Sequence, residues 1–200
     1  MCVAGPAEQM ATYADLLALP DDVRAEVLGG QVTTAPAPLP RHARAQRSLG
    51  HYIGGPFDDD DGVGGPGGWW IFVEVDIELG THDVVRPDLS GWRRERLPRP
   101  GSERPIHVTP DWVCEVLSPS TAMLDRGPKR DLYHQHGIPW YWLVDTEARL
   151  VEVFRRTEPE GWQLVGAFGD GQTSAMPPFE AIEVPIGRLF LPRDADGASD

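Results

Sequence analysis

One short apolar run that contains a single carboxylate, WVCEVL at residues 112–117, constrains the fold of this chain more than any other segment. Such a run is typical of a β-strand that is covered on both faces of its sheet. A buried charge is costly unless it is paired or binds a metal ion, so Glu115 needs a partner. That partner is either a basic side chain in an ordinary ion pair or a cation shared with a second acid.

The other elements are predicted from hydrophobic periodicity and from helix-start and turn residues. The predicted helices are residues 12–20, 41–53 and 128–137. The predicted strands are a hairpin around Gly29 and Gly30, the runs 69–80, 84–92, 111–118 and 139–145, and a hairpin of 149–157 with 161–168. Pro87 predicts an edge position or a bulge for the strand 84–92. Residues 54–68 and 118–127 are predicted as loops, and residues 184–190 as a short closing element.

The length of the chain, 200 residues, is enough to bury one sizeable core. We expect one domain over residues 12–190, with disordered ends at residues 1–11 and 191–200. No stretch approaches the roughly 20 apolar residues of a membrane-spanning helix, and residues 1–9 lack a signal-peptide pattern. A cytoplasmic protein without a membrane partner is therefore expected. The two cysteines do not support a disulfide framework, and Cys114 is expected in the core.

The net charge of −13 is unusual for a protein that binds nucleic acid, because such proteins usually carry a basic surface. Part of the acidic excess is local, in the tail RDADGASD and in the run Asp58–Asp61, which we expect to be solvated. Arginines gather between Arg86 and Arg104, and this cluster predicts a local basic patch. Glu74 and Asp76 alternate with apolar residues, which predicts that they face water.

Two acids from neighbouring predicted strands form the candidate metal site. Asp88, like Glu115, interrupts a strand-like sequence, and it follows a proline that bends the chain. Two carboxylates from adjacent strands supply oxygen ligands for Mg²⁺ or Mn²⁺ and leave other positions to water and a substrate phosphate. A cation held in this way acidifies water and stabilises the charge that develops in phosphodiester hydrolysis. The pair therefore predicts a hydrolytic centre.

Lys129 is the candidate basic residue of that centre. Strand alternation places residue 117 on the same side as Glu115, but this residue is Leu117. Lys129 lies in the first turn of the predicted helix 128–137 and is the one lysine in the sequence. It is either a site residue, which would stabilise the phosphate charge, or an exposed residue at a helix start.

Four further residues are weaker candidates for the site. Glu26 lies in the predicted N-terminal hairpin and would contribute another acid. His42 and Gln46 are one helical turn apart and share a helix face. Tyr133 shares a face with Lys129 in the same way, and we expect it in the core.

These segments together resemble the Uma-type endonuclease family, a branch of the PD-(D/E)xK restriction-endonuclease-like superfamily. The resemblance extends from Thr12 to Phe190. Its most specific segment is PDWVCEVLSPSTAMLDRGPKRDLYHQHGIPWYWLVD, supported by AEVLGGQV, PLPRHARAQ and VVRPDLSGW. Each segment is a weak signal by itself, but the set in this order is specific.

The resemblance implies an α/β fold with the superfamily's restriction-endonuclease-like αβββαβ core. The implied mixed β-sheet is flanked by helices, with an N-terminal hairpin and a C-terminal hairpin extension. The resemblance also implies that Asp88 and Glu115 bind the metal ion. The family's other site positions match Glu26, His42 and Lys129. In the parent superfamily the lysine follows the glutamate by two residues, where this chain has Leu117. Members of the superfamily often work in pairs, so a homodimer is a further hypothesis.

Two function hypotheses follow from these observations. The first is an endonuclease that hydrolyses DNA with Mg²⁺ or Mn²⁺. The second is a catalytically inactive nuclease fold that binds nucleic acid or a protein partner, which Leu117 and the net negative charge favour. The sequence contains no glycine-rich phosphate loop, dinucleotide fingerprint, HExxH or nucleophile-elbow motif, so nucleotide hydrolases, zinc proteases and α/β-hydrolases are disfavoured.

Overall fold

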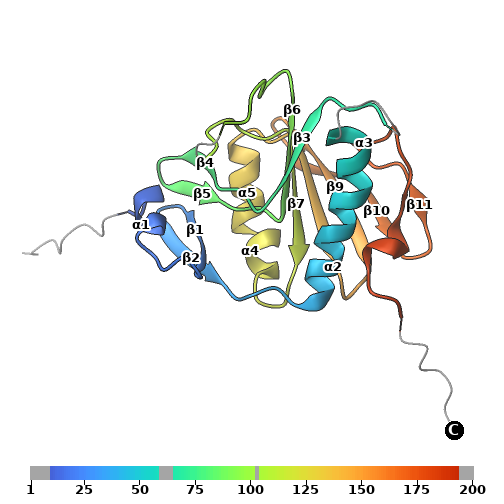
Figure 1. Ribbon diagram of the computed structural model, residues 1–200, viewed down its shortest axis with the longest axis horizontal. Coiled ribbons are helices and arrows are strands. Elements are labelled where there is room, and N and C mark those ends of the chain that lie inside the picture. Colours follow the sequence, from blue (N-terminus) through green and yellow to red (C-terminus); the bar gives the residue numbers. More distant parts are fainter. Residues whose placement is uncertain (1–9, 59–64, 102–103, 194–200) are drawn as a thin grey trace, which may run out of the picture.

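A six-stranded mixed sheet lies at the centre of the computed structural model, which describes residues 10–58, 65–101 and 104–193. The strand order is β10-β9-β8-β7-β6-β3. The strands are β3 (Trp69–Val73), β6 (Leu89–Arg93), β7 (Trp112–Leu117), β8 (Trp140–Asp145), β9 (Leu150–Thr157) and β10 (Gly161–Gly169). Helices α4 (Ala122–Arg126) and α5 (Pro128–Gln135) lie on one side of this sheet, and α2 (Pro40–Leu49) lies on the other (Figure 1).

The order of elements contains the αβββαβ core that the resemblance implied. Along the chain it runs α2, β3, β6, β7, α5 and β8. Strand β6 pairs antiparallel with both β3 and β7, and β7 pairs parallel with β8. The hairpin of β9 and β10 extends the sheet beyond β8, as predicted. The predicted fold class is therefore confirmed.

A smaller four-stranded sheet, with the order β2-β1-β5-β4, holds the N-terminal hairpin. Its strands are β1 (Arg24–Leu28), β2 (Gln31–Ala35), β4 (Ile77–Gly80) and β5 (Asp83–Val85). The hairpin turns at Gly29 and Gly30, whose φ angles are 57° and 79°. Two successive positive φ values suit a tight hairpin turn and favour glycine at both positions.

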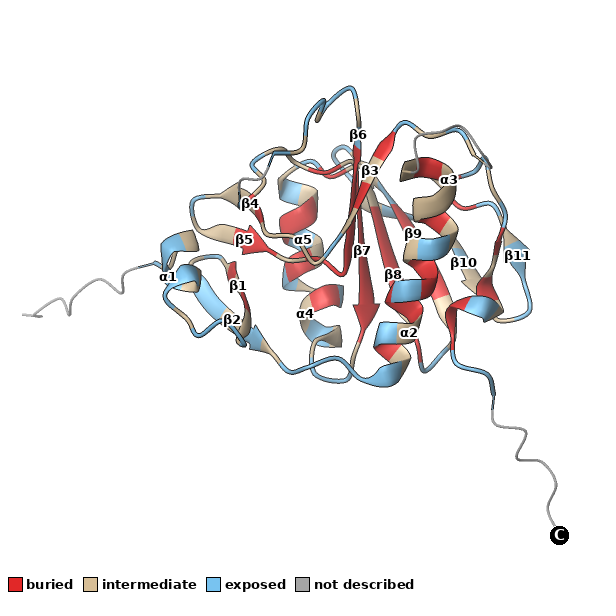
Figure 2. Cartoon of the chain, in the orientation of Figure 1, coloured by how far each residue is buried: buried red, intermediate tan, exposed pale blue. Residues whose placement is uncertain are grey.

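The two sides of β7 pack into two separate parts of the core. Trp112, Cys114 and Val116 belong to a cluster that includes Ala45 and Leu49 of α2. The alternate residues Val113 and Leu117 belong to a second cluster, which includes Leu132 and Tyr133 of α5. Figure 2 shows that β7 is buried along its length. Because side chains alternate along a strand, Glu115 lies on the α5 side.

Two of the predicted strands are each divided in the structure. Residues 69–80 form β3 and β4 in different sheets, and the chain turns at Glu74, which has a φ of 51°. Residues 84–92 form β5 and β6 on either side of residues 86–88. Pro87 cannot donate to a ladder, which suits this crossing point, but β6 lies between β3 and β7 and is not an edge strand. The prediction of one continuous strand was wrong in both places.

Two predicted loops contain short helices. Residues 118–127 include α4, and residues 54–68 include α3 (Gly55–Asp58). Tertiary packing explains the second case, since Phe57 is buried and its ring centroid lies 4.8 Å from that of Phe179. The rest of that predicted loop includes residues 59–64, which lie outside the described residues together with most of the acidic run at 58–61.

Four of the remaining elements match their predictions. They are α1 (Tyr13–Leu17), which begins at the Thr12 cap, a π-helical turn (Gly50–Gly54) that continues α2, β12 (Val184–Pro185) and a 3₁₀ turn (Ile186–Leu189). Strand β11 (Thr173–Ser174), which pairs with β12, was not predicted. Of the predicted disordered ends, residues 1–9 and 194–200 lie outside the described residues. Within the described residues, no helix has the length and apolar character needed to cross a membrane.

Candidate active site

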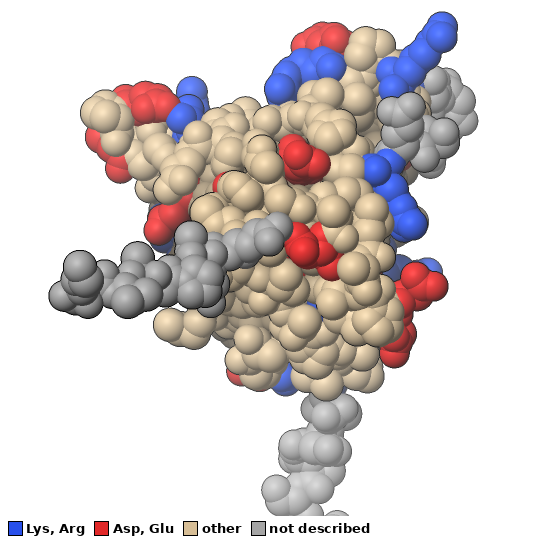
Figure 3. Space-filling model, turned by 90° about the vertical axis from the view of Figure 1, so that its left-hand side faces the viewer, with Lys and Arg blue, Asp and Glu red and all other residues tan. Residues whose placement is uncertain are grey.

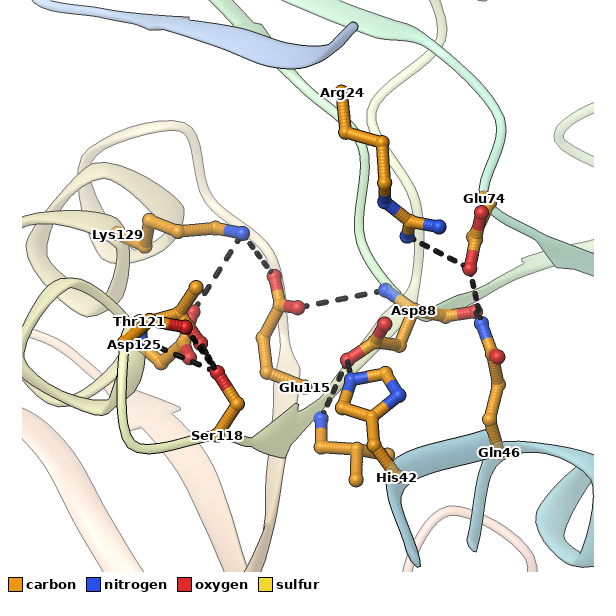
Figure 4. Close-up of polar contacts among 12 residues, drawn as sticks. Arg24, His42, Gln46, Glu74, Asp88, Glu115, Ser118, Thr121, Asp125 and Lys129 are labelled. Carbon is orange, nitrogen blue, oxygen red and sulfur yellow. Dashed lines mark hydrogen bonds and ion pairs between the residues drawn. The ribbon is translucent and has the colours of Figure 1, made fainter. Parts of the chain in front are cut away.

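Asp88, the residue before β6, lies beside Glu115 of the adjacent strand β7. Leu89 at the start of β6 pairs with Cys114, so the next position along each strand brings Asp88 opposite Glu115. The backbone N–H of Asp88 points to Oε2 of Glu115 at 3.4 Å (Figure 4). Both residues are buried, with 8% and 3% of their surfaces exposed. The two acids that the sequence singled out are thus close neighbours.

Asp88 is held from two elements. Its Oδ2 accepts a hydrogen bond from the backbone N–H of Val116 at 2.7 Å and lies 3.1 Å from Nε2 of His42. Gln46, one turn further along α2, donates from Nε2 to the backbone carbonyl of Asp88 at 3.2 Å. Among the described residues, no hydrogen bond reaches Oδ1 of Asp88, so this oxygen is available to a ligand.

Glu115 uses one carboxylate oxygen for two contacts from α5. Its Oε1 lies 2.7 Å from Nζ of Lys129 and accepts a hydrogen bond of 2.6 Å from the hydroxyl of Tyr133. Its other oxygen, Oε2, faces Asp88. Burial raises the pKa of Glu115 well above its usual range, and Lys129 opposes this rise.

Lys129 is buried, with 4% of its surface exposed. Besides Glu115 it contacts Glu26, with Nζ 3.0 Å from Oε1, and Asp125, with Nζ 3.7 Å from Oδ1. Burial by itself would lower its pKa, but these carboxylates outweigh burial and raise it well above the ordinary value. Of the two alternatives for Lys129, the exposed helix-start position is therefore wrong. The sequence indicated that Glu115 needs a partner, and Lys129 is that partner.

The structure adds two residues to the site that sequence reasoning missed. Asp125 is buried in the loop predicted at 118–127, and burial raises its pKa from 3.8 to about 6. Tyr133 lies in the core, as expected, but its hydroxyl also binds Glu115. Helical spacing was the signal for Tyr133, which lies four residues after Lys129 on α5, whereas Asp125 lies on α4 in a segment predicted as a loop and had no such signal.

A pocket of about 290 Å³ opens beside these residues. Its walls come from β1, from residues 36–39 and from residues 118–121, and its floor contains Asp88 and Glu115. The acids that line it are Glu26, Asp88, Glu115 and Asp125, and the basic residues, apart from His42, are Arg24, Arg86 and Lys129. The pocket therefore has an excess of acidic groups.

The predicted basic patch is not a free cationic surface. Arg86 pairs with Asp76 at 2.7 Å, and Arg96 pairs with Asp111 at 2.7 Å. Arg93 lies over the ring of Trp69, 4.3 Å from its centroid. Figure 3 shows one face of the molecule on which basic side chains lie mainly at the margins. Asp76 was also mispredicted as facing water, since its side chain is 8% exposed.

The donor set partly fits a divalent cation. Oδ1 of Asp88 and Oε2 of Glu115 belong to neighbouring residues, and neither oxygen has a strong partner among the described residues. Four carboxylates surround Lys129 and His42, so a further positive charge would be favourable there. Within the described residues, however, no three or more His, Cys, Asp and Glu side chains form a ready-made metal cluster. Such an ion would therefore keep other ligands, such as water and substrate oxygens.

Comparisons with known proteins agree with the resemblance seen in the sequence. The chain matches the Uma2 family, described as "Putative restriction endonuclease", over residues 10–187. Among solved structures it is similar to a protein of Anabaena variabilis described as "a putative nuclease belonging to DUF820", with 22% identity and a TM-score of 0.68, over 90% of this chain and 97% of that chain. No match was found among curated proteins. The family match supports a nuclease function, and the solved structure shows a shared fold.

Proposed function

Because this chain belongs to the Uma2 family, we propose that it is an endonuclease that hydrolyses phosphodiester bonds of DNA with Mg²⁺ or Mn²⁺. One observation carries the proposal. Two buried carboxylates, Asp88 and Glu115, lie together at the floor of a pocket and each keeps an oxygen available. Restriction-endonuclease-like proteins generally use a divalent metal, and carboxylate oxygens are the ligands that Mg²⁺ prefers.

Asp88 and Glu115 would hold the cation through Oδ1 and Oε2. A bound divalent cation supplies acidified water and stabilises charge on the scissile phosphate. His42 and the Val116 N–H hold the other oxygen of Asp88, so the carboxylate cannot rotate freely. Tyr133 and Lys129 hold Oε1 of Glu115, so that carboxylate cannot rotate freely either. The protein thus orients both ligands before any substrate binds.

Lys129 has an electrostatic role in this proposal. Its raised pKa keeps the ammonium protonated near neutral pH, so it does not serve as a base. Its charge lowers the pKa of Glu115 and so opposes burial, which favours the neutral acid and raises that pKa. Glu26, on β1 of the smaller sheet, in turn holds the ammonium. The lysine on α5 therefore stands in for the one that the parent superfamily carries two residues after the glutamate, a position that Leu117 fills with core packing.

Cleavage assays on purified protein test the proposal. Asp88→Asn and Glu115→Gln keep side-chain volume and remove one charge each, and we expect either to abolish Mn²⁺-dependent cleavage of plasmid DNA. Calorimetry should show Mn²⁺ binding to the unaltered protein and none to the double variant. Glu147→Gln is the matched control, because Glu147 is a 63% exposed acid paired only with Arg41 among the described residues.

Two results would contradict the proposal. Cleavage at the unaltered level in both single variants, or in excess chelator, would remove Asp88 and Glu115 from the chemistry. An absence of Mn²⁺ binding, together with measurable binding of DNA or a protein partner, would support the inactive binding module instead.

A further inference from the structure

Lys129 is committed to the protein's own carboxylates. An ammonium has three donors, and Nζ of Lys129 lies within 4 Å of carboxylate oxygens of Glu115, Glu26 and Asp125. A nucleic-acid strand that enters the pocket brings additional negative charge to a place that already has an acidic excess. Other cationic groups in the pocket are therefore needed to bind the strand.

Arg24, the first residue of β1, is one of these groups. Its side chain is 31% exposed, and it lines the pocket. One guanidinium nitrogen lies 2.8 Å from Oε1 of Glu74, which also accepts a hydrogen bond of 2.9 Å from Gln46 (Figure 4). Among the described residues this is its one ionic contact, so most of its five N–H donors remain for a ligand.

Arg86, between β5 and β6, is held in the same way. Its Nε donates to Oδ1 of Asp76 at 2.7 Å, and its side chain is 29% exposed and lines the pocket. Asp76 is further fixed by the hydroxyl of Tyr13 at 3.0 Å. Both anchoring carboxylates, Glu74 and Asp76, come from the turn between β3 and β4. That turn therefore positions two guanidinium groups at the pocket.

From this arrangement we infer that Arg24 and Arg86 form a phosphate-binding subsite for the substrate strand, separate from the phosphate that is cleaved at Asp88 and Glu115. Guanidinium groups suit phosphate because their planar donors match its oxygens. An arginine anchored through one nitrogen loses little further freedom on binding, which favours affinity. The inference rests on the proposed function and names how the same pocket binds its substrate.

Strand binding can be measured without cleavage. Fluorescence anisotropy of a short fluorescein-labelled DNA strand in chelator, over a series of salt concentrations, gives both affinity and its salt dependence. We expect Arg24→Gln and Arg86→Gln each to weaken binding by about tenfold and to reduce the salt slope by about 1. In cleavage assays the same variants should raise KM more than they lower kcat.

Three controls separate binding from folding. Arg96→Gln removes an arginine with an equally short carboxylate contact, 2.7 Å to Asp111, that does not line the pocket, and it should leave binding unchanged. Arg86→Gln leaves Asp76 buried without a cation, so the double variant Asp76→Asn with Arg86→Gln repeats the test without that charge. Inorganic phosphate at the same concentration as the strand should not displace it.

The subsite is wrong if Arg24 and Arg86 variants that remain folded bind the strand as the unaltered protein does, or if Arg96→Gln weakens binding equally. Displacement by inorganic phosphate at equal concentration would indicate a site for free phosphate and would also overturn the inference. The proposed function fails independently, through cleavage that survives Asp88→Asn and Glu115→Gln. If Asp88→Asn and Glu115→Gln abolish cleavage while Arg24→Gln and Arg86→Gln leave strand binding unchanged, the proposed function stands and the subsite does not.

Discussion

At the scale of single residues, Lys129 sets the charge balance of the site. It is the basic residue that contacts Glu115, Glu26 and Asp125 together. Removing one partner of a buried ion pair leaves uncompensated charge, which is more costly than the pair is stabilising. Lys129 is therefore the cation that compensates the charge of these buried carboxylates, and it lowers the pKa of Glu115 and of Asp125 against the effect of burial.

Replacing Lys129 by Met should consequently destabilise the fold. We expect a loss of about 3 kcal/mol in the free energy of unfolding, measured by urea denaturation. The double variant Lys129→Met with Glu115→Gln should recover part of this loss, because it removes one of the unpaired charges. Equal stability of Lys129→Met and the unaltered protein would show that the ammonium is not needed for folding.

Asp125 predicts a measurable dependence of stability on pH. Its pKa is about 6 in the folded protein against an ordinary value of 3.8. The folded state therefore binds the proton more readily, and this group adds stability as pH falls below about 7. Between pH 8 and pH 5 the gain is about 1 kcal/mol.

Asp125→Asn lacks that titration. As the pH falls from 8 to 5, its free energy of unfolding relative to the unaltered protein should therefore fall by about 1 kcal/mol. Urea denaturation of both proteins at the two pH values measures the difference. Asp131→Asn serves as control, since Asp131 is an exposed acid on the neighbouring helix. A difference that stays constant with pH would contradict the raised pKa.

Gln46 acts on the site through the backbone of Asp88. Its amide joins the carbonyl of Asp88 to the carboxylate of Glu74. Partners that orient metal ligands typically change metal affinity by about 10-fold to 100-fold when lost. Gln46→Leu should therefore weaken Mn²⁺ binding by about tenfold in calorimetry, whereas Gln163→Leu on the exposed part of β10 should not. Unchanged Mn²⁺ affinity in Gln46→Leu would exclude this role.

At the scale of elements, the N-terminal hairpin closes one side of the site, because β1 carries both Arg24 and Glu26. Its turn allows a matched test. Alanine at Gly29 would meet nothing within 4 Å, so its cost is the positive φ alone, about 1 to 2 kcal/mol. Alanine at Gly30 would also place Cβ 2.8 Å from Cβ of Met10. Urea denaturation should rank Gly30→Ala as the less stable variant, and the opposite order would exclude this packing.

At the scale of the whole molecule, the acidic pocket predicts that a divalent cation stabilises the fold. A ligand at about 100 times its Kd adds about 2.7 kcal/mol, which for a chain of this size raises Tm by about 5 to 10 °C. Thermal unfolding with and without Mn²⁺ should show this rise, and the Asp88→Asn and Glu115→Gln double variant should not. An equal rise in both proteins would place the ion elsewhere.

The sequence by itself determined the elements whose signals are local. Strand β7 followed from its apolar run, the hairpin turn from Gly29 and Gly30, and α5 from Pro128 at its start. Asp88 and Glu115 also stood out, because a charge within a strand-like sequence is costly without a partner. Periodicity and turn chemistry depend on neighbouring residues, so they can be read without a fold.

Only the tertiary structure decided where two of the predicted strands divide, which sheet each part joins and which distant side chains come into contact. The turn at Glu74 and the crossing at Pro87 send parts of two apparent strands into a second sheet, which no local period reveals. Lys129 and Glu26 are 103 residues apart and still in contact, so the burial of the lysine depends on how α5 packs against β1. Local pattern fixes which face of an element is apolar, whereas packing between distant elements fixes which charges meet.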